Sequence, residues 1–245
     1  MSNWLYNKYE PNGRKGDNMN YFNQNPEEVI QKLQSQTQGL SSSEVKERLE
    51  KNGYNELKEG KKKSTLQLFL EQFKDFLIII LIIAAAISFM FGEEKSAITI
   101  GVVLILNAVL GVVQQKKAES SLNSLKKLSA PTAKVIRNGS SEQIPARELV
   151  VGDIVTLDAG DYIPADGRII ESSSLQVIES SLTGESTAVD KQAEKIDKND
   201  VALGDMINMV FSSGLVTYGR AKFIVTGTGM DTEIGKIACL IQSTK

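Results

Sequence analysis

The chain has 245 residues, of which 24% are charged and 41% hydrophobic, which is ordinary for a folded protein. Its net charge of -2 gives no indication of a nucleic-acid partner. The single cysteine, Cys239, excludes an intrachain disulfide and a cysteine-rich zinc site, and the absence of histidine excludes a Ser-His-Asp triad. Any proton transfer must therefore use carboxylates, lysine or tyrosine.

The N-terminal region divides into a polar stretch and a helical unit. Residues 1–18 are rich in Asn, Lys and Gly, so we expect them to be disordered. Residues 19–60 contain the start and stop signals of two short helices, each of about a dozen residues. These signals are Asn25 and Pro26 at the start of the first helix, and Ser41, Glu44 and Gly53 for the capping box and the end of the second.

Residues 61–129 contain two long apolar runs. Residues 76–91, "FLIIILIIAAAISFMF", carry no charge, and residues 97–113 are interrupted only by Asn107. A bilayer core of ~30 Å requires about 20 helical residues, so flanking residues must contribute to each span. We expect a transmembrane hairpin with spans at about 66–92 and 96–116; a buried helical hairpin in a soluble protein is the alternative.

The distribution of lysines favours the membrane hairpin over the soluble one. The lysines before the first run and after the second are Lys58, Lys61, Lys62, Lys63, Lys116 and Lys117, whereas the link "GEEKS" contains one. Lysine-rich flanks remain cytoplasmic, so both termini should be cytoplasmic and the lipid bilayer is a partner. The stretch from Ala97 to Ser129 lacks proline, which predicts a second helix of about 50 Å that continues beyond the membrane as a stalk.

The remainder of the chain has the texture of a β domain. Residues 130–232 contain short β-branched runs and frequent turns, with a hairpin signal at Asn138-Gly139, and predict a small antiparallel β-roll. Residues 233–245 begin another helix. The spacing of Asp158, Asp161 and Asp166 fits no EF-hand, so we interpret these residues as turn formers and expect no metal site. The fold class is thus a mixed α and β membrane protein.

One loop of this β domain attracts attention because of a single carboxylate. The stretch "SLTGESTAV" places Glu185 between a glycine and a serine, in a loop of small polar residues. Taken alone, it is most simply a solvent-exposed turn in which Thr183, Gly184 and Ser186 shape the backbone. A catalytic carboxylate is the other interpretation.

Several motifs, in this order, resemble a known family. "GDIV" at 152–155, "PADGR" at 164–168, "LTGES" at 182–186 and "TEIGKIA" at 232–238 are similar to the actuator segment of P-type cation-transporting ATPases. "GLSSSEVKERLEKNGYNEL", residues 39–57, resembles the N-terminal helical unit of the same family. No Cys-x-x-Cys metal-binding motif is present, and "LTGESTAVDK" looks closest to the calcium-pump branch.

The resemblance implies a role for each residue of the loop. Glu185 would hold and polarise the water that hydrolyses an aspartyl phosphate carried by another domain. Gly184 would allow a phosphate to approach the backbone, and Thr183 and Ser186 would set the loop or contact the phosphate site. Nearby, Pro164, Asp166 and Gly167 would shape the fold.

The resemblance also implies what this chain needs from elsewhere. The "DKTG" motif that carries the phosphorylated aspartate occurs nowhere in the sequence. We therefore expect the N-terminal portion of a pump, inactive alone, whose partners are missing phosphorylation, nucleotide-binding and transport portions. A complete pump would use ATP and Mg²⁺, neither bound by this chain. A non-enzymatic, membrane-anchored binding or regulatory module is the alternative; it would not need the glutamate of "TGES".

Overall fold

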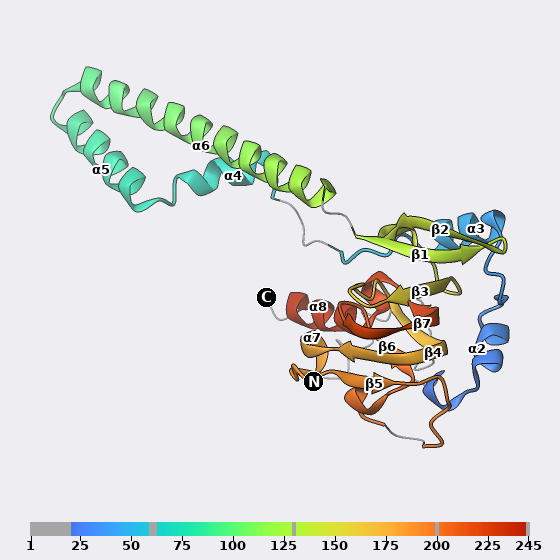
Figure 1. The fold of residues 1–245 in the computed structure, drawn as a ribbon. Coiled ribbons are helices and arrows are strands. Elements are labelled where there is room, and N and C mark those ends of the chain that lie inside the picture. The colour runs from blue at the N-terminus through green and yellow to red at the C-terminus, as the bar shows by residue number, and fades with distance from the viewer. Residues whose placement is uncertain (1–20, 59–62, 129–130, 199–200, 244–245) are drawn as a thin grey trace, which may run out of the picture. The chain divides into compact units, whose positions relative to one another are not determined.

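The computed structural model describes residues 21–58, 63–128, 131–198 and 201–243 (Figure 1). These residues form two compact units, one before residue 59 and after residue 130 and the other between them. The predicted disorder of residues 1–18 lies outside the described residues.

The helical unit contains α4 (Thr65–Gln72), α5 (Phe76–Met90) and α6 (Glu94–Leu128). The expected span at 66–92 consists of two helices, since α4 and α5 are bent by 68° at the break between them. Asp75 explains the break: its carboxylate accepts a hydrogen bond from Leu77 N at 2.9 Å and so caps α5. The start of α4 has a capping box, in which Ser64 N donates to Gln67 Oε1 and Gln67 N donates to Ser64 Oγ.

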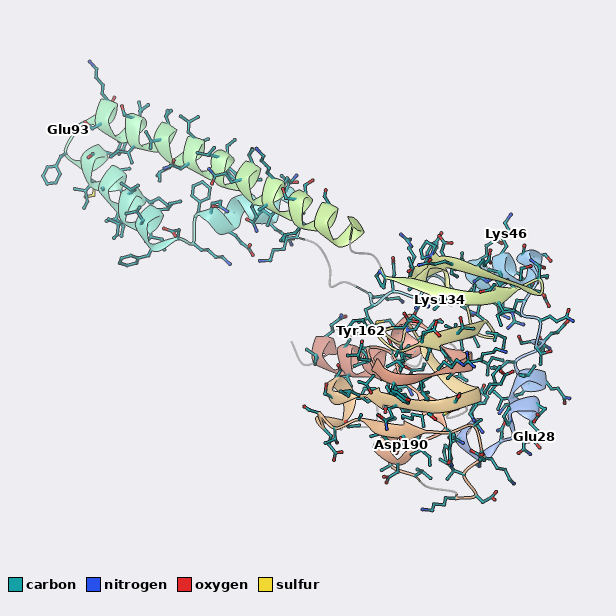
Figure 2. The ribbon with its side chains drawn as sticks, viewed as in Figure 1. Glu28, Lys46, Glu93, Lys134, Tyr162 and Asp190 are labelled. Atoms are coloured by element: carbon teal, nitrogen blue, oxygen red, sulfur yellow. The ribbon has the colours of Figure 1, made fainter. Side chains whose placement is uncertain are left out.

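The helix α6 runs unbroken for 35 residues, as the absence of proline predicts. Leu104, Ala108 and Val112 form its buried stripe, and Gly111 lies against the side chain of Gln72 from α4. Most other apolar side chains of α5 and α6 are exposed, and Glu93 lies at the turn between these helices (Figure 2). Among the described helices, α6 is long and apolar enough to cross a bilayer, and the bent pair α4–α5 would qualify as one broken span.

The second unit is built on an antiparallel sheet, as predicted. Its strands follow the order β2-β1-β3-β7-β4-β5, and β6 pairs with β4. Their bounds are β1 Thr132–Arg137, β2 Ser140–Pro145, β3 Ile154–Asp158, β4 Asp166–Ile178, β5 Val189–Lys191, β6 Met209–Val210 and β7 Leu215–Gly227. The hairpin signal is confirmed, because β1 and β2 are joined at Asn138 (φ 49°) and Gly139 (φ 74°).

Short helices lie between the strands and after the last one. They are α7 (Ser180–Thr183) between β4 and β5, α8 (Glu233–Ser243) after β7, and the 3₁₀ turns η3 (Ala146–Glu148), η4 (Leu203–Asp205) and η5 (Gly229–Asp231). The predicted start of the last helix at residue 233 is confirmed. Figure 1 shows α7 and α8 at the same end of the sheet.

The N-terminal helices are α2 (Pro26–Lys32) and α3 (Ser42–Asn52). The capping box of α3 is confirmed: Ser41 N donates to Glu44 Oε2 at 2.8 Å, and Glu44 N donates to Ser41 Oγ at 3.4 Å. Gly53, at φ 79°, ends α3 as predicted. The prediction of about a dozen residues is wrong for α2, which has seven because the chain turns at Gln34 with φ 49°.

The sheet is buried on both faces, since neighbouring residues of β7 enter different cores. Phe223 and Val225 belong to one apolar cluster, whereas Ile224 belongs to the other. The second cluster also contains Val29 and Ile30 of α2. The N-terminal helical segment is therefore part of the same unit as the sheet and covers one of its faces.

The "PADG" stretch shapes the start of β4. A Cβ atom on Gly167 would lie 2.0 Å from Phe223 Cδ2 and 2.6 Å from Ile224 O, so only glycine fits between β4 and β7. The buried carboxylate of Asp166 accepts from Ser212 N at 2.8 Å and from Glu233 N at 2.7 Å. It thus fixes the β6–β7 turn and the first residue of α8 to the same strand.

Burial raises the pKa of Asp166 from 3.8 to about 6, against the opposing effect of its two backbone hydrogen bonds. Because the folded-state pKa lies above the unfolded value, the folded state binds this proton more tightly. Asp166 should therefore lower the free energy of unfolding by ~3 kcal/mol as the pH rises from about 4 through about 6.

Urea unfolding of the full chain in lipid nanodiscs, followed by pulse proteolysis across this pH range, measures the effect against Asp166→Asn. The variant lacks the ionisation, so the stability of the wild type should fall relative to it as the pH rises. Parallel curves for the two proteins would contradict the prediction.

Candidate functional site

The loop that contains Glu185 lies between β4 and β5, after the single turn of α7. Gly184 ends this turn in the left-handed conformation, with φ 77°, and its N–H donates to Ser180 O at 3.0 Å. A Cβ atom at Gly184 would meet nothing within 4 Å. Within this chain, glycine is therefore favoured by the backbone conformation and not by close packing, and the space beside it is open.

Thr183 connects the two ends of the turn through its hydroxyl group. Thr183 Oγ1 donates to Glu179 O at 3.1 Å and accepts from Glu185 N at 3.2 Å. The backbone N–H groups of Leu182 and Thr183 also donate to Glu179 O, each at 3.0 Å. A single carbonyl at the end of β4 thus organises the turn and, through Thr183, the backbone of Glu185.

The carboxylate of Glu185 is presented to solvent. Residues 183–188 are all exposed, including Gly184 and Ser186 on either side of Glu185. Among the residues that the structure describes, none donates a hydrogen bond to this carboxylate. The arrangement offers the exposed carboxylate of Glu185 and the hydroxyl group of Ser186 to a group that approaches the loop. A solvated turn has the same geometry.

Beneath the loop lies a buried ion pair that the sequence analysis missed. Glu179 and Lys191 are buried, and Lys191 Nζ lies 2.8 Å from Glu179 Oε2. Burial raises the pKa of Glu179 and lowers the pKa of Lys191, in each case against the attraction of its partner. The local sequence gave no signal, because a Glu and a Lys beside short strands are most often exposed.

Of the three aspartates interpreted as turn formers, Asp158 and Asp161 lie at the turn after β3, whereas Asp166 lies in β4. Lys134 Nζ lies 2.7 Å from Asp158 Oδ2 and 3.2 Å from Asp161 Oδ2 (Figure 2 labels Lys134 on β1). Asp158 N also donates to Asp161 Oδ2 at 3.0 Å, which closes the turn after β3. In the described part of the chain, no group of three or more His, Cys, Asp or Glu side chains could hold a metal ion.

Comparison with family models identifies the class of protein that carries this sheet, loop and pair of apolar helices. Residues 127–242 match the P-type ATPase actuator domain, and residues 21–88 match the cation transporter/ATPase N-terminus. The two matches lie in the order that the motifs predict. The chain belongs to the P-type ATPase family.

Several similar proteins are named as ATPases. Calcium-transporting ATPase 1 of Lactococcus lactis subsp. lactis (strain IL1403) is 53% identical over 227 residues, which are 93% of this chain and 26% of that protein. The calcium-transporting ATPase of Bacillus subtilis (strain 168) is 50% identical over 85% of this chain and 24% of its own length. Sodium/potassium exporting P-type ATPase 2 of Saccharomyces cerevisiae is 42% identical over 85% of this chain and 19% of its own length. The chain thus spans about a quarter of the length of the bacterial relatives it matches.

Proposed function

We propose that this chain is the front portion of an ATP-driven calcium pump, in which the Glu185 loop drives dephosphorylation of an aspartyl phosphate on another part of the pump. The observation that supports this most is the presented "TGES" loop within a chain 53% identical to a calcium-transporting ATPase. Calcium is favoured over sodium or potassium as the transported ion. The chain is 53% identical to the calcium-transporting ATPase and 42% identical to the sodium/potassium exporting ATPase.

In the proposed reaction, Glu185 acts as a general base. Its carboxylate accepts a proton from a water molecule while the water oxygen forms a bond to phosphorus. The bond between phosphorus and the aspartate oxygen breaks, which releases inorganic phosphate and restores the aspartate carboxylate. The open space beside Gly184 and the exposed hydroxyl group of Ser186 would receive the phosphoryl group, while Thr183 sets the loop.

The same proposal assigns the helical unit to the membrane, with the bilayer as its partner. The exposed apolar side chains of α5 and α6 support this, because such a surface is costly in water and favourable in lipid. The bent pair α4–α5 and the helix α6 would form two spans joined at Glu93, with both termini in the cytoplasm. The C-terminal part of α6, which follows the apolar run, would extend into the cytoplasm and serve as the stalk.

ATP and Mg²⁺ would be supplied with the rest of the pump. A complete P-type ATPase uses both, and we propose that neither is bound by this chain. The Glu185 loop has hydroxyl groups and one carboxylate, and these alone do not form a set of oxygen ligands for Mg²⁺. The proposed role of Glu185 is confined to the orientation and deprotonation of water.

A chimeric pump tests the proposal. In it, this chain replaces the matching 227-residue region of the Lactococcus lactis relative. We expect ATP-dependent calcium uptake into inverted membrane vesicles at a rate within about tenfold of the intact relative, because the two sequences share half their residues. The chimera with Glu185→Gln is the matched control and should show no uptake.

The alternative function, a non-enzymatic regulatory module, predicts different results. Such a module would not restore uptake in the chimera and would instead change the activity of an intact pump when added beside it. That change would be indifferent to Glu185→Gln. Uptake by the chimera that survives Glu185→Gln would contradict the proposed role of the loop.

A further inference from the structure

The buried pair Glu179–Lys191 occupies the base of the Glu185 loop. Glu179 directly follows β4, and Lys191 is the last residue of β5, where it is paired with Leu175 of β4. The side chains are 2% and 0% exposed, respectively, so the pair is isolated from solvent. It therefore joins the two ends of the loop from within the protein.

Lys191 is held from several directions. Its Nζ atom lies 3.4 Å from Met206 O and 5.6 Å from the centre of the Phe211 ring, in addition to the contact with Glu179. Its backbone carbonyl accepts from Ser172 Oγ at 3.0 Å. The backbone of Lys191 is thus held by β4, and its ammonium group by the segment before β6 and by Phe211, none of which belongs to the loop.

The pair is not needed to fill the core. Removing two charges from water is costly, and replacement of a buried ion pair by apolar residues of similar volume is often neutral or stabilising. In addition, Glu179 Oε1 is buried and has no hydrogen-bond partner within the described structure. Two buried charges with an unsatisfied oxygen are therefore weak evidence for a stabilising role, and the benefit of the pair is sought in the position of the loop.

That benefit is evident in the path from the pair to Glu185. The residue whose side chain binds Lys191 is also the residue whose carbonyl organises the turn. From Glu179 O the path leads to Thr183 Oγ1 at 3.1 Å and then to Glu185 N at 3.2 Å. Rotation or displacement of Glu179 would therefore move the backbone of Glu185.

We propose that Glu179 and Lys191 are positioning residues that hold the loop in the orientation in which Glu185 meets the phosphoryl group. This inference rests on the proposed function of Glu185. The pair touches neither water nor phosphate in the reaction; it acts through Thr183. Its contribution is specificity of position and not stability of the fold.

Hydrogen exchange of the full chain in lipid nanodiscs tests the positional claim without any pump activity. The test variant is the double substitution Glu179→Leu/Lys191→Met, which removes both charges at once and leaves no unpaired buried charge. We expect exchange in peptides covering residues 180–188 to become about tenfold faster, with exchange in β3 and β7 unchanged. Thr183→Val, which breaks the same path at its next step, should have the same local effect.

A second buried pair provides the matched control. Arg137 Nη2 lies 2.7 Å from Asp153 Oδ2, at the opposite part of the sheet order, between β1 and the start of β3. Arg137→Met/Asp153→Asn should leave exchange of the loop unchanged. Unchanged loop exchange in the Glu179→Leu/Lys191→Met variant, beside faster exchange in Thr183→Val, would overturn the proposal, and so would faster exchange throughout the sheet.

The chimeric pump separates this inference from the proposed function. The double variant should slow decay of the phosphorylated pump, leave its formation unchanged, and add no further loss to Glu185→Gln, because the pair acts through Glu185. A further loss on top of Glu185→Gln would overturn the positioning role. If Glu185→Gln itself leaves the decay unchanged, the proposed function fails, while the exchange measurement still decides whether the pair orders the loop.

Discussion

Glu185→Gln in the chimeric pump is expected to slow hydrolysis of the phosphorylated intermediate by roughly 10²–10⁴-fold. Glutamine has nearly the same shape as glutamate but cannot accept the proton of the attacking water. Formation of the intermediate does not use this proton, so the phosphorylated pump should accumulate. Labelling with radioactive ATP, followed by a chase with unlabelled ATP, measures the decay directly.

The control for this experiment is Asp190→Asn. Asp190 is an exposed carboxylate on β5, close in sequence to the loop, and its Oδ1 accepts from Gln176 Nε2 at 3.0 Å (Figure 2). It has the same charge as Glu185, so it reports any general electrostatic effect of a lost carboxylate. We expect normal decay in this variant. Equal slowing in both variants would mean that local negative charge, and not a positioned base, supports the reaction.

Local signals in the sequence predicted the elements that depend on neighbouring residues. The capping box of Ser41 and Glu44, the end of α3 at Gly53 and the hairpin at Asn138 each involve residues a few positions apart. The long α6 follows from a stretch without proline. In each case the stabilising contact is contained within the pattern that predicted it.

Features that depend on distant pairing could not be predicted in this way. The strand β3 lies between β1 and β7, although β7 follows it by more than fifty residues, and no local pattern specifies that neighbour. The bend between α4 and α5 was missed because Phe73 and Leu70 continue the apolar pattern up to Asp75, whose capping role depends on which way the chain turns. A hydrophobic pattern specifies which face of a strand or helix is buried, but it does not specify which other element packs against that face.

The functional roles of the candidate site residues stay predictions, and only their placement can be compared with the structure. The motif gave Glu185, Gly184, Thr183 and Ser186, and the structure adds the hydroxyl path from Thr183 to Glu179. Lys191 could not be found, because a lysine in a short strand ordinarily reaches solvent. Its burial results from packing against Phe211 and Met206, which come from a later part of the chain.

Arg168 carries the second large expected effect, this time on stability. Its side chain is fully buried, and among the described residues its partners are backbone carbonyl groups and no carboxylate. Arg168 Nε donates to Tyr21 O at 3.0 Å, and Nη2 donates to Gln24 O at 3.1 Å and Ala193 O at 2.8 Å. Nη1 donates to Ile169 O and Asn208 O. One guanidinium thus attaches the segment before α2 to β4 and to the chain that follows β5.

Burial lowers the pKa of Arg168 to about 10, which leaves the group charged at neutral pH. Arg168→Met keeps much of the side-chain volume and removes every donor. Several buried carbonyl groups would then lose their partners at ~1–3 kcal/mol each, partly offset by the removal of a desolvated charge. We expect the free energy of unfolding to fall by about 3–5 kcal/mol, which is a large loss for a single substitution.

Urea unfolding of the full chain in nanodiscs, followed by pulse proteolysis, measures this loss. Chymotrypsin cleavage beside Tyr21 and Phe22, both buried in the native unit, should become faster because these residues detach first. Arg168→Lys should be nearly as destabilising, since an ammonium group cannot reproduce the planar fork that reaches carbonyls on opposite sides. Arg220→Met, at an exposed position of β7, is the control and should change stability by less than about 0.5 kcal/mol. Equal stability of Arg168→Met and Arg220→Met would show that the hydrogen bonds of Arg168 are not needed to hold the N-terminal segment to the sheet.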